Sequence, residues 1–121
     1  MKTYRSLFFV CLAALILRLG CLLFVQHPGI GDPNHYYNLG LRLLEGHGFT
    51  IDYIWQFYNP PQSIVHPDDF WMPLTGILAA FSMKLFGTTP TGSLIVFVVL
   101  GSLLPIMGYI AAKQFGCNQT S

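Results

Sequence analysis

Charged side chains are scarce in this sequence. Lysine and arginine supply six residues and aspartate and glutamate supply five, so only 9% of the 121 residues are charged, against roughly 25% in soluble proteins. Hydrophobic residues make up 53% of the chain, and the mean hydropathy is +0.53. So few charged side chains cannot cover the surface of a soluble domain of this size. The composition therefore excludes that class and indicates an integral membrane protein.

Two further classes are excluded by what the sequence lacks. The formal net charge is only +1, so there is no basic patch to neutralise nucleic-acid phosphates, and we expect no nucleic-acid partner. Cysteine is also scarce. Cys11 and Cys21 lie in one apolar run and Cys117 lies near the end of the chain, which predicts neither a disulfide framework nor a metal site of the CxxC type.

The polar residues are concentrated in one part of the chain. Every acidic residue and every histidine lies between residues 27 and 69: Asp32, Glu45, Asp52, Asp68, Asp69, His27, His35, His47 and His66. The sequence before and after this segment is nearly all apolar. This distribution predicts one polar loop, at residues 26–69, between membrane-spanning helices.

We expect an all-α membrane fold with three transmembrane helices, at residues 7–25, 70–86 and 94–112. The first stretch has 19 residues, which at about 1.5 Å per residue nearly cross a hydrocarbon core of about 30 Å. The second is shorter and carries Pro73, Ser82 and Lys84. In the third, Thr89-Pro90 predicts the helix start, and Pro105 predicts a kink.

The first apolar stretch has a second interpretation. Lys2 and Arg5 precede it, as basic residues precede the apolar region of a signal peptide. Its length and the lack of a small-x-small cleavage site favour an uncleaved helix instead. The same two basic residues favour a cytoplasmic N-terminus, which places the loop at residues 26–69 outside the cytoplasm. Lys84 agrees with this orientation and Lys113 does not.

Residues 32–46 predict a short amphipathic helix. Asp32 is suited to the N-cap, Pro33 to the first turn, and Gly46 to the helix stop. One face carries the apolar side chains of Tyr36, Leu39, Leu43 and Leu44. A helix of this kind between two spans is expected to lie on the membrane surface as a juxtamembrane helix. We expect Asp68 or Asp69 to cap the following span.

These segments together resemble a known family. The order is an apolar helix with a late arginine, then GDPNHYYNLGLRLLEGHGF, then HPDDFWMPLTGILAAFSMKLFG, then a third span ending in AAKQFG. It resembles the N-terminal end of the polyprenyl-phosphate-sugar-dependent glycosyltransferases with the GT-C fold. The nearest branch is glycosyltransferase family 39, the protein mannosyltransferase and aminoarabinose transferase relatives. The matching positions are Asp32, Tyr36, Gly46, Gly48, Phe49, Pro73, Leu85, Phe86 and Gly87.

The resemblance implies a membrane glycosyltransferase. Such an enzyme transfers a sugar from a polyprenyl-phosphate donor to a glycan, lipid or protein acceptor outside the cytoplasm, and its essential first-loop acid corresponds to Asp32. Pro33 departs from the pattern, because members often carry a second acid there. Members are also several times longer, so the resemblance implies that this chain is an N-terminal fragment, inactive by itself.

The candidate site residues each have a structural alternative. Asp32 is either a helix cap or a general base, and a carboxylate stabilised at a helix N-terminus can serve as both. Arg18 lies within an apolar span, where it either extends to the membrane surface or contacts a lipid-linked phosphate. Tyr36 is either a membrane-interface anchor or a surface for sugar stacking. His35 is expected to be a solvated helix residue, or else to face the site.

The remaining candidates follow each other closely in the sequence. His66, Asp68 and Asp69 form either a cap and turn or an acceptor-binding group. Carboxylates with a histidine suit Mg²⁺ or Mn²⁺, although the sequence does not establish a metal. Two other functions compete with sugar transfer: a small non-enzymatic three-span subunit, and a piece of a transporter or flippase. Acids gathered in an outer loop favour the transferase, because a transporter more often places polar residues within its spans.

Overall fold

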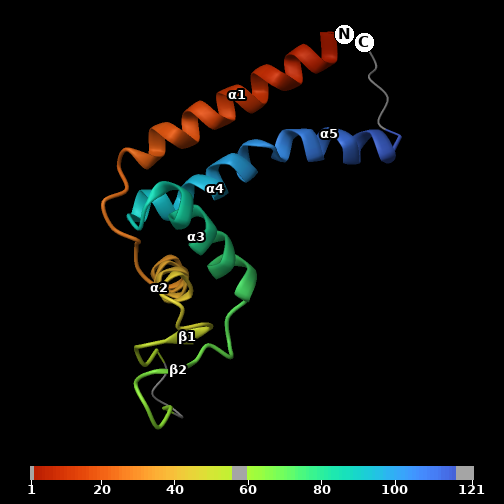
Figure 1. Cartoon of the computed structure of the whole chain (residues 1–121). Coiled ribbons are helices and arrows are strands. Elements are labelled where there is room, and N and C mark those ends of the chain that lie inside the picture. Colours follow the sequence, from red (N-terminus) through yellow and green to blue (C-terminus); the bar gives the residue numbers. More distant parts are fainter. Residues whose placement is uncertain (1, 56–59, 117–121) are drawn as a thin grey trace. The chain divides into compact units, whose positions relative to one another are not determined.

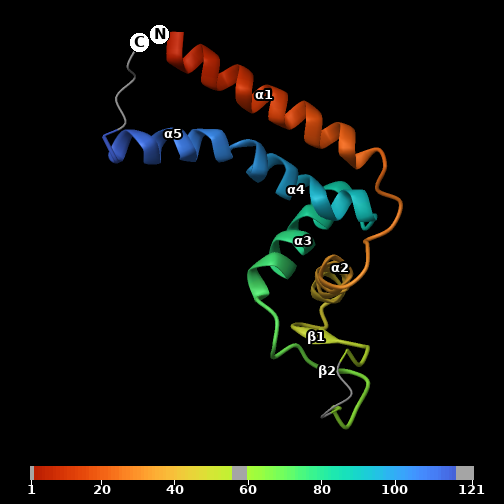
Figure 2. The ribbon, with the colours of Figure 1, turned by 180° about the vertical axis from the view of Figure 1, so that it is seen from behind.

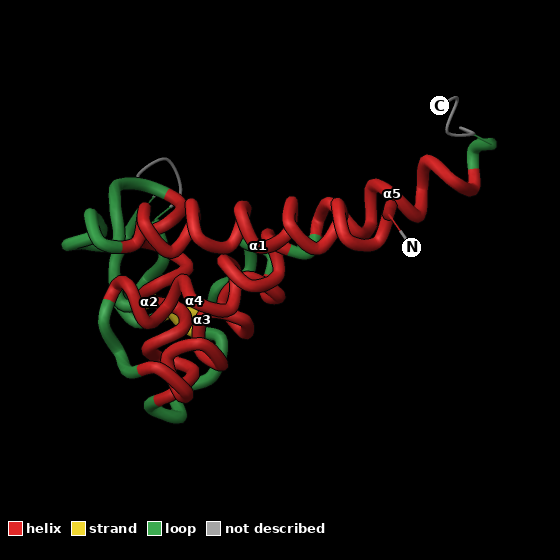
Figure 3. The backbone as a smooth tube through the Cα atoms, turned by 90° about the horizontal axis from the view of Figure 1, so that it is seen from above, coloured by secondary structure: helices red, strands yellow, loops and turns green. Residues whose placement is uncertain are grey.

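The computed structural model describes residues 2–55 and 60–116 and is mainly helical (Figures 1 and 3). In chain order, its elements are α1 (Lys2–Leu22), α2 (Asp32–Leu44), β1 (Thr50–Ile51), β2 (His66–Pro67), α3 (Pro73–Phe86), α4 (Pro90–Ser102) and α5 (Leu104–Gln114). The chain divides into two compact units. One unit combines Met1–Phe24 with Phe97–Ser121, and the other is Val25–Val96.

Two helical stretches are long and apolar enough to cross a membrane. They are Thr3–Leu22, with 20 residues, and Pro90–Gln114, with 25 residues through α4 and α5. The third predicted span, at residues 70–86, is a helix only from Pro73 to Phe86. Its 14 residues extend about 21 Å, less than the hydrocarbon thickness of about 30 Å. Two of the three predicted spans therefore have the required length.

Proline and threonine set the ends of α4 and α5 as the sequence predicts. The Thr89 hydroxyl oxygen accepts a hydrogen bond from the Gly92 N–H at 3.0 Å, which caps the helix that begins at Pro90. The helical path is interrupted at Leu103, and α5 begins at Leu104 with proline in its first turn. Pro105 has no N–H to continue the helical hydrogen bonding of α4, which confirms the predicted kink.

Helix α2 packs against α3 through small residues (Figure 2). A β-carbon added to Gly76 would lie 2.6 Å from Cδ2 of Leu39, and one added to Gly40 would lie 3.1 Å from Cβ of Ala79. Leu39 is completely buried by this contact. The predicted apolar face is therefore covered in part by protein. Leu43 is only half-buried.

Helices α3 and α4 are joined by one buried hydroxyl group. Ser82 is completely buried; its hydroxyl donates to the Gly92 carbonyl oxygen at 2.5 Å and accepts from the Val96 N–H at 3.1 Å. These two backbone groups are four residues apart, the spacing of a helical hydrogen bond. The hydroxyl thus satisfies polar backbone groups where two apolar helices meet.

The two ends of α2 differ in how well they were predicted. The helix begins at Asp32, and Gly31 occupies the N-cap with φ 76° and no side-chain cap, so the prediction that Asp32 is the N-cap is wrong. Asp32 still lies in the first turn, where the helix dipole favours a carboxylate. At the other end, Gly46 has φ 81°, and the N–H of His47 bonds to the Arg42 carbonyl at 2.9 Å. This Schellman motif confirms the predicted stop.

Two short strands interrupt the expected all-α fold. β1 pairs with β2 in antiparallel register, with Thr50 opposite Pro67 and Ile51 opposite His66. The Asp68 N–H continues the pairing by donating to the Phe49 carbonyl at 3.0 Å. The pairing brings the segment at residues 66–68 next to residues 49–51.

An arginine of α2 forms side-chain hydrogen bonds with β1 and with the residue that follows it. Arg42 donates from Nε to Thr50 Oγ1 at 2.9 Å and from a terminal nitrogen to Asp52 Oδ2 at 3.3 Å. The loop between the apolar helices is therefore a folded part of the Val25–Val96 unit, built around α2.

Candidate functional site

The polar loop forms a small, partly open cavity of about 190 Å³. Residues 31–35, at the start of α2, form one side of the cavity. Residues 53–55, which follow β1, form a second side, and Trp71 completes the wall. The lining residues are Gly31, Asp32, Asn34, His35, Tyr53, Trp55 and Trp71. All of them belong to the Val25–Val96 unit. The cavity therefore gathers residues from three separate segments of one compact unit.

A chain of hydrogen bonds runs behind this cavity. The Tyr53 hydroxyl lies 2.5 Å from Nδ1 of His35, and Nε2 of His35 lies 3.1 Å from Oδ2 of Asp68. The side chains of His35 and Asp68 are only 4% and 2% exposed. Buried polar groups of this kind need partners, and here each ring nitrogen of His35 has one.

Tyr53 takes part in this chain as a protonated phenol. Burial, followed by the negative charges of Asp68 and Asp52, raises the pKa of Tyr53 to about 12, so the phenol is neutral at physiological pH. When the His35 ring carries its proton on Nε2 only, the Tyr53 hydroxyl donates to Nδ1 and Nε2 donates to the Asp68 carboxylate.

Aromatic rings form most of the remaining wall. The rings of Trp55 and Trp71 are 6.1 Å apart at an interplanar angle of 70°. The Trp71 ring also lies 4.8 Å from the His35 ring and 5.9 Å from the Tyr36 ring. Among the described residues, buried Trp71 Nε1 and buried Asp68 Oδ1 have no hydrogen-bond partner.

Several predicted site residues lie in or beside this cavity. Asp32 lines it while remaining exposed to solvent. His35 also lines it, but the expectation of a solvated helix residue is wrong, because His35 is only 3% exposed. Tyr36 is half-buried and packs edge-on against His35 at 5.4 Å. Asp68 does not line the cavity, but it bonds to His35, which does.

The other predicted residues do not take part. His66 Nδ1 lies 2.9 Å from the Ile64 carbonyl oxygen, and Asp69 is exposed; neither residue lines the cavity. The expectation that Asp68 or Asp69 caps α3 is wrong, because Met72 occupies that position. Arg18 belongs to the other unit, where a β-carbon added to Gly101 would lie 3.0 Å from its Nε.

No metal site forms among the residues that the structure describes, because they contain no group of three or more potential histidine, cysteine, aspartate or glutamate ligands. His66, Asp68 and Asp69, suggested as Mg²⁺ or Mn²⁺ ligands, are engaged separately. His66 bonds to the backbone, and Asp68 to His35.

Five lining residues were not identified as site residues from the sequence: Gly31, Asn34, Tyr53, Trp55 and Trp71. Tyr53 is separated from His35 by 18 residues, and Asp68 by 33, so no local spacing connects them. The clustering of acids and histidines in one segment was the only signal, and it located the loop but not the cavity.

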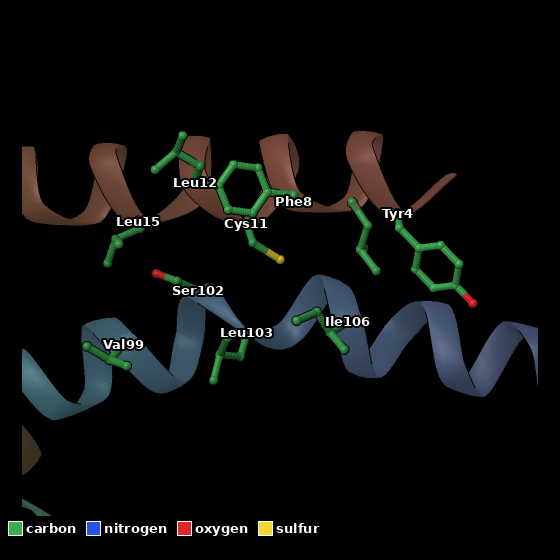
Figure 4. Close-up of a pocket in the computed structure, with 10 residues that line it drawn as sticks. Tyr4, Phe8, Cys11, Leu12, Leu15, Val99, Ser102, Leu103 and Ile106 are labelled. Carbon is green, nitrogen blue, oxygen red and sulfur yellow. The ribbon is translucent and has the colours of Figure 1, made fainter. Parts of the chain in front are cut away.

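A second hollow lies in the unit that contains α1 and α5. It is an apolar groove of about 370 Å³ between α1 and the α4–α5 stretch (Figure 4). Its lining is almost entirely aliphatic and aromatic: Tyr4, Leu7, Phe8, Cys11, Leu12, Leu15, Val99, Ser102, Leu103 and Ile106. The Ser102 hydroxyl already donates to the Val98 carbonyl at 2.6 Å. The groove therefore presents a largely apolar surface whose lining holds no carboxylate, histidine, lysine or arginine.

Comparisons with protein-family models, with the curated proteins and with the solved structures find no match for this chain. The functional interpretation therefore depends on the residues that line the hollows, which include a third one of about 650 Å³ beside Tyr109 and Lys113. Of these, only the loop cavity carries a carboxylate, a histidine and a phenol. It is the candidate functional site.

Proposed function

We propose that this chain is the N-terminal part of a membrane glycosyltransferase. It transfers a sugar from a polyprenyl-phosphate donor to an extracytoplasmic acceptor, and Asp32 is the general base. The observation that carries the proposal is the position of Asp32: an exposed carboxylate that lines a small cavity walled by aromatic and hydrogen-bonding side chains. The resemblance of the loop sequence to the family 39 transferases supports the same role.

The proposed reaction needs an accessible, ionised carboxylate. Asp32 takes a proton from an acceptor hydroxyl, the oxygen attacks the anomeric carbon of the sugar, and the lipid phosphate leaves with the bonding electron pair. Asp32 lies in the first turn of α2, where acidic side chains are favourably placed relative to the helix dipole. No ion pair or hydrogen bond occupies the Asp32 side chain among the described residues, so it is available to a substrate.

The proposal also specifies a membrane arrangement. α1 and the α4–α5 stretch cross the membrane, α3 is a short third crossing, and α2 lies near the membrane surface. Lys2 and Arg5 place the N-terminus in the cytoplasm and residues 26–69 outside. The apolar groove of about 370 Å³ offers a surface of the kind that a prenyl chain contacts. Arg18 then meets the lipid phosphate.

The test is sugar transfer by an Asp32→Asn variant of the complete reading frame. Membranes are supplied with radiolabelled polyprenyl-phosphate mannose, glucose or aminoarabinose, and transfer is normalised to folded enzyme. Because asparagine cannot accept the proton, we expect a loss of about 10²–10⁴-fold in rate. Asp69→Asn is the matched control, because it removes an exposed carboxylate outside the cavity and should leave transfer unchanged. Turnover by Asp32→Asn within a few-fold of wild type would contradict the proposal.

A further inference from the structure

The charges around the loop cavity are one-sided. The segment at residues 26–69 holds five acidic residues and one arginine, and that arginine, Arg42, is paired with Asp52. No lysine or arginine lines the cavity, whereas Asp32 does. Asp68 adds a second carboxylate, which bonds to His35 in the cavity lining. The cavity is therefore an electronegative environment.

The cavity wall adds the electrostatic field of its aromatic rings. Trp55, Trp71 and Tyr53 all line it, and the two indole rings meet at an interplanar angle of 70°. The faces of such rings carry negative potential, and several rings at an angle to each other form the kind of cage that holds methylated ammonium groups. A carboxylate beside the cage strengthens the attraction for a cation.

Hydrogen bonding argues against a hydroxyl-rich ligand as the main occupant. His35 uses both ring nitrogens, one of them with the Tyr53 hydroxyl. Asn34 Oδ1 already accepts from Asn38 at 3.2 Å. Asp32 is the one carboxylate in the lining, and the donors that remain are the Asn34 amide nitrogen and Trp71 Nε1, which is buried. A ligand held by charge and ring faces suits this lining better than one that needs many hydrogen bonds.

We propose that the cavity binds a small quaternary ammonium group, with Asp32 as counter-ion and Trp55 and Trp71 as the cage. At about 190 Å³, it is smaller than the roughly 300–1,000 Å³ of most ligand pockets, so it accommodates a headgroup and not a whole lipid or glycan. The inference concerns the ligand class of the cavity and does not depend on sugar transfer. An acceptor that carries a quaternary ammonium headgroup would satisfy both this proposal and the proposed sugar transfer.

Tryptophan fluorescence gives a direct test, because the chain has only two tryptophans and both line the cavity. The full chain is purified in maltoside micelles without choline lipids and titrated with choline. The comparison ligand is the neutral isostere, in which a tert-butyl group replaces the trimethylammonium group. We expect a saturable response to choline and binding of the isostere at least about ten-fold weaker, because the cation–π and ionic attractions are lost.

Two variants of equal charge separate the cavity from the general negative charge of the loop. Asp32→Asn should weaken choline binding at least about five-fold, whereas Asp69→Asn should not change it; circular dichroism checks that both variants fold. Equal affinity for choline and its isostere, or the absence of a saturable fluorescence response to choline, would overturn the proposal. Equal effects of the two variants, or tighter binding of methyl mannoside than of choline, would also overturn it. None of these results decides whether Asp32 is the general base, because that proposal is tested by the separate sugar-transfer assay of Asp32→Asn.

Discussion

Replacing Tyr53 by phenylalanine would remove one hydroxyl from the buried chain that links Tyr53, His35 and Asp68. The phenyl ring keeps its edge-on contact with the His35 ring at 6.0 Å, so the packing changes little. Nδ1 of His35, however, loses its donor at 2.5 Å in a residue that is only 3% exposed. An unsatisfied buried acceptor costs about 1–3 kcal/mol, and we expect the free energy of unfolding to fall by that amount.

Tyr37→Phe is the matched control, because it makes the same chemical change in the same Val25–Val96 unit, on helix α2. The Tyr37 hydroxyl donates to the Thr88 carbonyl at 2.7 Å, but this bond is exposed to solvent. Water can replace the lost donor there, so we expect a change within about 0.5 kcal/mol. The difference between the two variants isolates the contribution of burial.

The assay is denaturant unfolding of the purified chain in detergent, followed by tryptophan fluorescence and circular dichroism. Trp71 lies 4.8 Å from the His35 ring, so its emission reports on this part of the fold. Equal stabilities of Tyr53→Phe and Tyr37→Phe would refute the reasoning. That result would mean that His35 is accessible to water, and that the hydrogen-bonded chain does not stabilise the loop.

Three further predictions follow from other contacts. Gly76→Ala should destabilise the chain by about 1–3 kcal/mol, because its β-carbon would lie 2.6 Å from Leu39 Cδ2. Gly20→Ala is the control and should not destabilise the chain, because a β-carbon there has no other atom within 4 Å. Equal melting temperatures of the two variants would contradict the α2–α3 packing. Because the pKa of Tyr53 is raised from 10.0 to about 12, its stabilising contribution is full below pH 10 and lost as pH rises toward 12. An absorbance titration should show this late tyrosinate, and Tyr53→Phe should lack it. A cysteine at Gln62 in a cysteine-free chain should react with an impermeant thiol reagent in intact cells; labelling only after lysis would reverse the proposed orientation.

Local signals predicted most helix ends correctly, because a helix end depends on a few neighbouring residues. Thr89, Pro105 and Gly46 act within one turn, and the structure has each in its expected role. The N-termini of α2 and α3 are the exceptions, because Gly31 and Met72 occupy the caps that were predicted to be aspartates. Gly31, with φ 76°, is the N-cap residue of α2. Glycine is a less preferred N-cap residue than aspartate, so the sequence pointed to Asp32 instead.

Contacts between distant residues could not be predicted in this way. The amphipathic pattern of α2 showed that Leu39 would be buried, but not that Gly76 on α3 would make room for it. The two-residue strands are likewise too short to leave a period in the sequence. The burial of His35 depends on Tyr53 and Asp68, which approach it only when the loop folds.

The same long-range contacts distinguish the acids that the sequence left as competing candidates. The Asp68 side chain is only 2% exposed, and one of its oxygens is bonded to His35, so it is not accessible to a substrate. Asp69 is accessible but lies outside the cavity lining. A general base must be both ionised and within reach of the proton that it removes. Among the described acids, Asp32 alone is exposed and also lines the cavity, so the proposed proton transfer is placed on Asp32, whereas Asp68 bonds to His35.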